Sequence, residues 1–113
     1  NYHDRVKYAG EKEIECKTID SFIVEKELNN IGLLNIDCNG GEHDVLSGAL
    51  VSLSKGIFQN VEISFLMPDL YGNAMSLGDL INNLKKFGYR FVMIFPIHIN
   101  FEIIKFKLFF NKI

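Results

Sequence analysis

Asp37, Asn39 and Glu42 place two carboxylates and an amide around a Gly-Gly pair. The apolar run before Asp37 predicts a strand over residues 31–36, and a helical pattern starts at Glu42. In open α/β sheets, ligands bind outside the carboxyl ends of the strands. A carboxylate at that place can hold a hydroxyl group or take its proton. We therefore predict Asp37 as the main site residue.

Each of these residues also has a structural interpretation. Asp37 can cap the helix start, and Glu42 can complement the helix dipole as a first-turn acid. Asn39 can be a turn residue, because asparagine tolerates positive φ. Glu62 lies on the polar side of a predicted strand over residues 57–66, where it either faces the same crevice or pairs with a neighbouring cation.

The acidic residues around His43 do not have the spacing of a known metal motif. A calcium loop starting at Asp37 would need glycine at position 42 and glutamate at position 48, where the chain has Glu42 and Gly48. Nucleophile motifs such as Gly-x-Ser-x-Gly or Cys-x-x-Cys are also missing from the sequence. We expect no metal site.

Composition describes one globular domain rather than two. The chain has 113 residues, 48% of them hydrophobic, with a net charge of −2, which does not favour a nucleic-acid partner. We expect no signal peptide, because the sequence begins with polar residues and has no apolar run there. We expect no membrane span, because charged residues interrupt the apolar tail. Cys16 and Cys38 are expected to be buried in strands, which suits a reducing, cytoplasmic location.

Residues 1–12 show no period and are expected to form an exposed lead-in. The pattern then predicts strand 13–18, helix 22–28 capped by Asp20 or Ser21, strand 31–36, helix 42–55, strand 57–66, a loop over 67–73, helix 77–87 capped by Ser76, strand 89–95 stopped by Pro96, and strand 100–110. Only residues 97–99 separate the last two strands, which requires an antiparallel hairpin. We predict an α/β fold with a mostly parallel sheet and an antiparallel terminal strand.

Four segments resemble, in order and spacing, the FkbM family of S-adenosylmethionine-dependent methyltransferases. They are Lys-Thr-Ile-Asp-Ser-Phe at 17–22, Ile-Gly-Leu-Leu-Asn-Ile-Asp-Cys-Asn-Gly-Gly-Glu at 31–42, Val-Leu-Ser-Gly-Ala at 45–49 and Val-Glu-Ile-Ser at 61–64. The resemblance implies a Rossmann-like sheet and transfer of a methyl group to a hydroxyl on a sugar, glycan or other small molecule.

The resemblance also implies roles for single residues. Asp37, Glu42 and Glu62 would be catalytic, and Asp37 and Asn39 would contact S-adenosylmethionine. The lysine and glutamate that usually flank the aspartate in the family are Asn35 and Asn39 here.

A glycine-rich turn for the cofactor is missing before Asp37, since no Gly-x-Gly strand–turn–helix pattern is found there. The resemblance therefore implies that residues 1–113 are a single partial domain, the carboxyl-terminal half of a methyltransferase, inactive on its own. The alternative is a non-enzymatic α/β interaction module. In either case we expect self-association through an exposed sheet edge, because a sheet without its first strands leaves an edge open and an apolar face uncovered.

Overall fold

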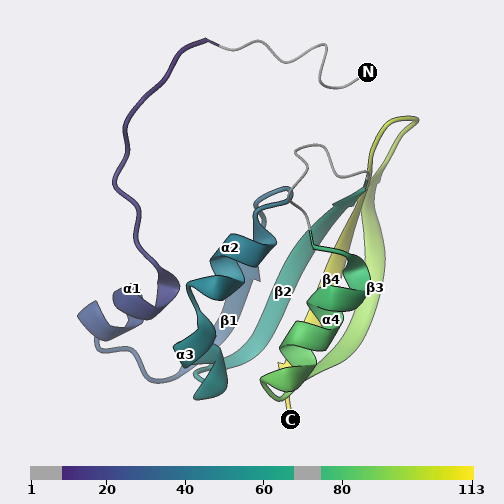
Figure 1. Ribbon diagram of the computed structural model, residues 1–113. Helices are drawn as coiled ribbons and strands as arrows, with labels where there is room; N and C mark the ends of the chain where they lie inside the picture. The colour runs from purple at the N-terminus through teal and green to yellow at the C-terminus, as the bar shows by residue number, and fades with distance from the viewer. Residues whose placement is uncertain (1–8, 68–74) are drawn as a thin grey trace.

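One sheet with helices against it forms the part of the protein that the computed structural model describes, residues 9–67 and 75–113. Figure 1 shows helices α2, α3 and α4 together on one side of this sheet. In chain order the elements are α1 (Ile19–Glu25), β1 (Ile31–Ile36), α2 (Glu42–Ser47), α3 (Leu50–Ser54), β2 (Phe58–Met67), α4 (Leu77–Lys86), β3 (Tyr89–Ile99) and β4 (Ile104–Lys112).

The four strands lie in the order β1-β2-β4-β3. β1 pairs with β2 in parallel, and β4 pairs antiparallel with both β2 and β3. The α/β class and the antiparallel final hairpin are thus confirmed. The predicted mostly parallel pairing is not confirmed, because β4 returns between β2 and β3 and separates two strands that point the same way.

The core lies between the helices and one face of the sheet. Alternate residues of β2 and β4 point to that face, as the period of two requires. The buried side chains contributed by the strands include Val61, Ile63, Leu108 and Phe110, and those contributed by the helices include Leu46, Leu53, Leu80 and Leu84. Leu108 and Phe110 of β4 are buried in this core, whereas Phe101 is fully exposed.

The predicted strand 13–18 is wrong. Residues 9–18 form no helix or strand and are exposed, which fits the expected lead-in for residues 9–12. The alternating pattern of 13–18 has no neighbouring strand in the described sheet. A strand without a neighbour leaves its backbone N–H and C=O groups unpaired, so the pattern alone does not make a strand. Cys16 and Cys38 are both exposed, so the prediction that they are buried is wrong too.

Two element boundaries differ from the predictions. The helix predicted over 42–55 is instead two helices, α2 and α3, which are separated at Gly48. Gly48 packs closely against Thr18, since a Cβ at position 48 would lie 3.1 Å from the Thr18 Cβ. β3 continues through Pro96 to Ile99, with a register shift after Pro96. Proline is accepted there because β3 is paired on one side by β4 and lies at the edge of the described sheet.

Helix caps were predicted correctly for α4 and incorrectly for α1. Ser76 accepts a hydrogen bond from the Asp79 N–H at 3.1 Å, as predicted. α1 is capped by Thr18, whose hydroxyl accepts from the Ser21 N–H. Most of the loop predicted over 67–73 lies outside the described residues. No helix in the described residues is long and apolar enough to cross a membrane.

Candidate functional site

The carboxyl end of β1 carries Asp37, and the amino end of β4 carries Lys105. Because β4 runs opposite to β2, Lys105 aligns with Leu66 near the carboxyl end of β2. The Lys105 Nζ lies 2.7 Å from Asp37 Oδ1. The Asp37 side chain is 53% exposed and that of Lys105 is 21% exposed. The structure therefore places the predicted aspartate at the rim of the sheet, in an ion pair that solvent can reach.

A second ion pair lies further into the sheet. The Lys107 Nζ is 2.8 Å from Glu62 Oε1, and the Glu62 side chain is only 11% exposed. Along β2, Glu62 alternates with Val61 and Ile63, which point into the core, so Glu62 points to the face opposite the helices. Glu62 thus pairs with a neighbouring cation, which is one of the two alternatives that the sequence left open for it. Its partner Lys107 and the Asp37 partner Lys105 are two positions apart on β4 and therefore lie on the same face of the sheet.

The turn after Asp37 explains the types of Asn39 and Gly40. Asn39 has a φ of 48° and Gly40 a φ of 109°, both in the region that favours asparagine or glycine. The Gly41 N–H donates to the Cys38 carbonyl at 3.2 Å. Asn39 remains exposed at the strand end, where it occupies a turn conformation and also presents its amide to solvent.

Glu42 is 2% exposed, which is unusual for a carboxylate. Its Oε1 accepts a hydrogen bond from the Gly40 N–H at 3.2 Å, so the side chain folds back on its own turn. It begins α2, where a negative charge suits the helix dipole. This geometry gives Glu42 a clear part in shaping the turn that carries Asp37 and Asn39.

Charge around this turn also affects Cys38. Although Cys38 is an exposed residue, desolvation by partial burial raises the pKa of its thiol. The nearby carboxylates of Glu42, Asp37 and Asp44 raise this pKa further, and the hydrogen bond with Gly41 lowers it. The thiol is therefore a poor nucleophile at neutral pH. Within residues 9–67 and 75–113, no three His, Cys, Asp or Glu side chains are grouped as metal ligands would be.

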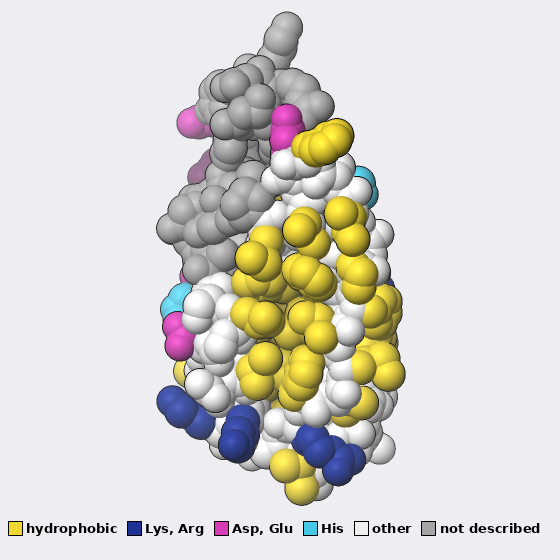
Figure 2. All heavy atoms as spheres, turned by 90° about the vertical axis from the view of Figure 1, so that its right-hand side faces the viewer, with side chains coloured by type: hydrophobic (Ala, Val, Ile, Leu, Met, Phe, Trp, Pro, Cys, Tyr) yellow, Lys and Arg dark blue, Asp and Glu magenta, His cyan; other side chains and the backbone are white. Residues whose placement is uncertain are grey.

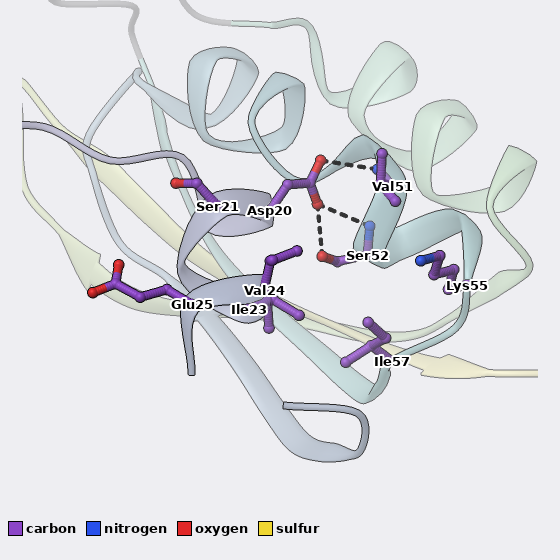
Figure 3. A pocket seen from close by; sticks show the side chains of 9 residues that line it. All are labelled: Asp20, Ser21, Ile23, Val24, Glu25, Val51, Ser52, Lys55 and Ile57. Carbon is purple, nitrogen blue, oxygen red and sulfur yellow. Dashed lines mark hydrogen bonds between the residues drawn. The ribbon is translucent and has the colours of Figure 1, made fainter. Parts of the chain in front are cut away.

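A separate pocket of about 440 Å³ lies between α1 and α3. Figure 3 shows the Asp20 carboxylate pointing toward Val51 and Ser52, to which it is hydrogen-bonded in the first turn of α3. Asp20 accepts from the Val51 N–H at 3.0 Å, the Ser52 N–H at 2.9 Å and the Ser52 hydroxyl at 2.6 Å. Burial opposes ionisation, yet these bonds and the charge of Lys55 keep the pKa of Asp20 below its ordinary value.

This pocket is not where the predicted site residues lie. Its lining is mostly apolar, and none of Asp37, Glu42 and Glu62 is part of it. The Asp20 oxygens are already engaged in joining α1 to α3, which leaves them little capacity for a ligand. We therefore treat the Asp20 pocket as structural and the Asp37 end of the sheet as the candidate site.

Lys105 and Lys107 are the site residues that the sequence did not reveal. They alternate with apolar residues in β4, which indicated only that they face away from the core. Lys105 is 68 positions from its partner Asp37 in the sequence. Lys107 is 45 positions from its partner Glu62, as residues 62 and 107 show. Only the pairing of β4 beside β2 brings them there.

The family model for the methyltransferase FkbM domain matches residues 2–91. This chain belongs to the FkbM methyltransferase family. The predicted resemblance is thus confirmed, over most of the chain up to the first residues of β3. A comparison with curated proteins found no match, and a comparison with solved structures found none either.

The register of the sheet places a neutral residue of β1 beside Glu62. Asn35 is the register partner of Glu62 on the neighbouring strand. The positive charge beside Glu62 comes from Lys107 of β4, which lies beyond the residues that the FkbM family model matches.

The FkbM family implies S-adenosylmethionine as the methyl donor. The end of β1 offers an exposed carboxylate on Asp37 and an exposed amide on Asn39, groups that suit the ammonium and carboxylate of an amino acid. They match one end of such a cofactor, and no Gly-x-Gly turn for its nucleoside is found in the sequence.

Proposed function

We propose that this chain is the acceptor-side part of an O-methyltransferase that methylates a hydroxyl on a sugar, glycan or related small molecule. The observation that carries the proposal is the position of Asp37. In a member of a methyltransferase family, it lies half-exposed where the parallel pair of β1 and β2 ends. In α/β sheets this is the place where ligands bind.

Asp37 is proposed to align the acceptor hydroxyl and to accept its proton. S-adenosylmethionine supplies a methyl group on a positively charged sulfur, so the hydroxyl needs alignment and modest base assistance. Lys105 pairs with Oδ1 of Asp37, and in our proposal Oδ2 receives the proton of the acceptor hydroxyl. The ion pair thereby fixes the orientation of the carboxylate at the rim.

The other predicted residues support this site in our proposal. Glu62, held by Lys107, lines the same face further from the rim. Glu42 holds the turn in shape through the Gly40 N–H, and Asn39 presents its amide to the cofactor. We include a cytoplasmic location in the proposal, since both free cysteines are exposed and a reducing compartment protects such thiols.

Cofactor binding by these 113 residues alone is proposed to be weak, because the sequence has no glycine-rich turn for the nucleoside. Calorimetric titration of the chain with S-adenosylmethionine tests this. We expect a Kd no tighter than about 1 mM, which corresponds to about 4 kcal/mol. A micromolar Kd would refute the argument that the nucleoside site is missing from this sequence. Methyl transfer to sugars by the chain alone should stay at the level of a sample without protein.

A further inference from the structure

The turn between β1 and α2 exposes an Asn-Gly pair to solvent. Asn39 is the only asparagine that a glycine follows in the sequence. Asn39 is exposed and has a φ of 48°, and Gly40 continues the turn with a φ of 109°. Because glycine has no Cβ, its backbone nitrogen can approach the side-chain amide of the preceding asparagine more closely than that of any other residue. Residues 39 and 40 therefore have the composition and the exposure that a reaction between them requires.

One contact restrains the nitrogen atom that would react. The Gly40 N–H donates to Glu42 Oε1 at 3.2 Å, which is at the long end of the usual range for a hydrogen bond. Glu42 is only 2% exposed, so its carboxylate is held in place by the surrounding packing. An N–H that donates to a carboxylate keeps its proton and its position. The Gly40 nitrogen can therefore attack a neighbouring carbon only after this contact opens.

We propose that Asn39 is a site of spontaneous deamidation and that Glu42 limits its rate in the folded chain. The Gly40 nitrogen gives its proton to hydroxide and forms a bond to Asn39 Cγ. The bond from Cγ to the side-chain nitrogen breaks, and that nitrogen leaves as ammonia. Water then opens the cyclic imide at one of its two carbonyl carbons. The product is aspartate or isoaspartate at position 39, and water is the only co-reactant.

Deamidation changes the charge and the backbone of the turn. Three carboxylates near Cys38 already make this turn negative; they belong to Asp37, Glu42 and Asp44. The product adds another carboxylate, and isoaspartate also lengthens the backbone by a carbon atom. In the proposed function the Asn39 amide contacts the cofactor, so the site should weaken as the protein ages. This consequence rests on the proposed function, whereas the deamidation itself does not.

Peptide mapping by mass spectrometry, during incubation of the chain at neutral pH, tests the proposal. We expect the mass gain that comes from replacing NH2 with OH to accumulate much faster at Asn39 than at Asn29. Asn29 is the internal control, because it is also exposed and outside the helices and strands but is followed by Asn30. Equal rates at Asn29 and Asn39, or no gain at Asn39, would overturn the proposal.

Long incubation also gives the chain time to self-associate. Figure 2 shows hydrophobic side chains gathered on one face of the molecule, and every residue of β3 after Tyr89 is exposed. Exposed apolar surface and open sheet edges favour association between copies. Dilute samples should therefore be used, and the monomer should be separated by size exclusion before mapping, so that all rates refer to the folded monomer.

Glu42→Ala tests the restraint on the Gly40 nitrogen. Loss of the acceptor frees the Gly40 N–H, and we expect Asn39 to deamidate about tenfold faster, as for the loss of a hydrogen bond to a charged group. Asp44→Ala is the matched control, since it removes an exposed acid of the same helix that is not the acceptor of this N–H. The control should react at the rate of the unchanged chain. An unchanged rate in Glu42→Ala would overturn the role of Glu42.

Unfolding in urea separates the effect of the folded turn from that of the sequence. The unfolded unchanged chain should deamidate at Asn39 faster than the folded one, and at the same rate as unfolded Glu42→Ala. A folded chain that reacts as fast as the unfolded chain would contradict the restraint, even if Glu42→Ala does not fold. Circular dichroism checks the fold of each variant. These measurements do not involve methyl transfer or cofactor binding, so the proposed function can fail while the deamidation site stands.

Discussion

Lys105 at the start of β4 holds Asp37 at the end of β1 with an Nζ–Oδ1 distance of 2.7 Å. The two residues are 68 positions apart in the sequence. The pair connects an edge strand of the described sheet to an inner strand across β2. It also gives Asp37, an exposed predicted site residue, a fixed orientation that a free side chain at a strand end would lack.

The two lysine–carboxylate pairs should contribute differently to stability. Lys107→Met leaves the nearly buried Glu62 carboxylate without its cation, and we expect a loss of about 2–3 kcal/mol in the free energy of unfolding. Lys105→Met leaves a carboxylate that water solvates, so we expect a loss of at most about 1 kcal/mol. Urea unfolding at pH 7 measures both.

Lys12→Met is the control for that comparison, because Lys12 is exposed and outside the helices and strands. It should leave the unfolding free energy unchanged. Equal losses for Lys105→Met and Lys107→Met would contradict the difference in burial between Asp37 and Glu62.

Asp20 should stabilise the fold as the residue that joins α1 to α3. Asp20→Ala removes the acceptor for the Val51 N–H, the Ser52 N–H and the Ser52 hydroxyl, and we expect a loss of about 1–2 kcal/mol at pH 7. Ser21→Ala, one position along and exposed, should cost less. Thermal unfolding of both variants provides the measurement.

The lowered pKa of Asp20 predicts that the free energy of unfolding depends on pH. The pKa of Asp20 is lower in the folded chain than its ordinary value of 3.8. Its stabilising contribution is therefore fully present above that value and is lost as the pH falls through the lower, folded value. The unfolding free energies of the unchanged chain and of Asp20→Ala should converge as the pH decreases through this range. A constant difference between them down to the lowest pH would count against the depressed pKa.

Cys38 should react slowly with alkylating reagents. Its pKa is above the ordinary value of 9.0, chiefly because of burial and then because of the Glu42 carboxylate. In a Cys16→Ser background, the rate of reaction with iodoacetamide should rise with a midpoint above pH 9.0, and Asp44→Asn should move that midpoint down. A midpoint below 9.0 would show that the carboxylates do not act on the thiol.

The sequence predicted the parts of the fold that depend on local patterns. The apolar run of 31–36, the Ser76 cap and the turn at Asn39 each follow from residue type and spacing, and the structure contains each of them. The family resemblance likewise rested on short segments in order. Local chemistry was sufficient at these positions.

Features that depend on distant strands could not be predicted in the same way. Alternation in 13–18 resembles that of a strand, but a strand also needs a neighbour, and no strand among the described residues pairs with this segment. The insertion of β4 between β2 and β3 changed the pairing from mostly parallel to mostly antiparallel. The same insertion brought Lys105 and Lys107 to Asp37 and Glu62, and nothing in the spacing of the lysines indicated this.

Amide NMR spectra of the 15N-labelled chain, titrated with S-adenosylmethionine to millimolar concentration, test the central claim most directly. The account predicts weak binding, with shift changes concentrated at residues 37–42, that Asp37→Asn reduces and the control Asp44→Asn does not. Shift changes at Asp20 and Ser52 instead, or an equal response in the Asp37→Asn chain, would contradict the placement of the site at the end of β1.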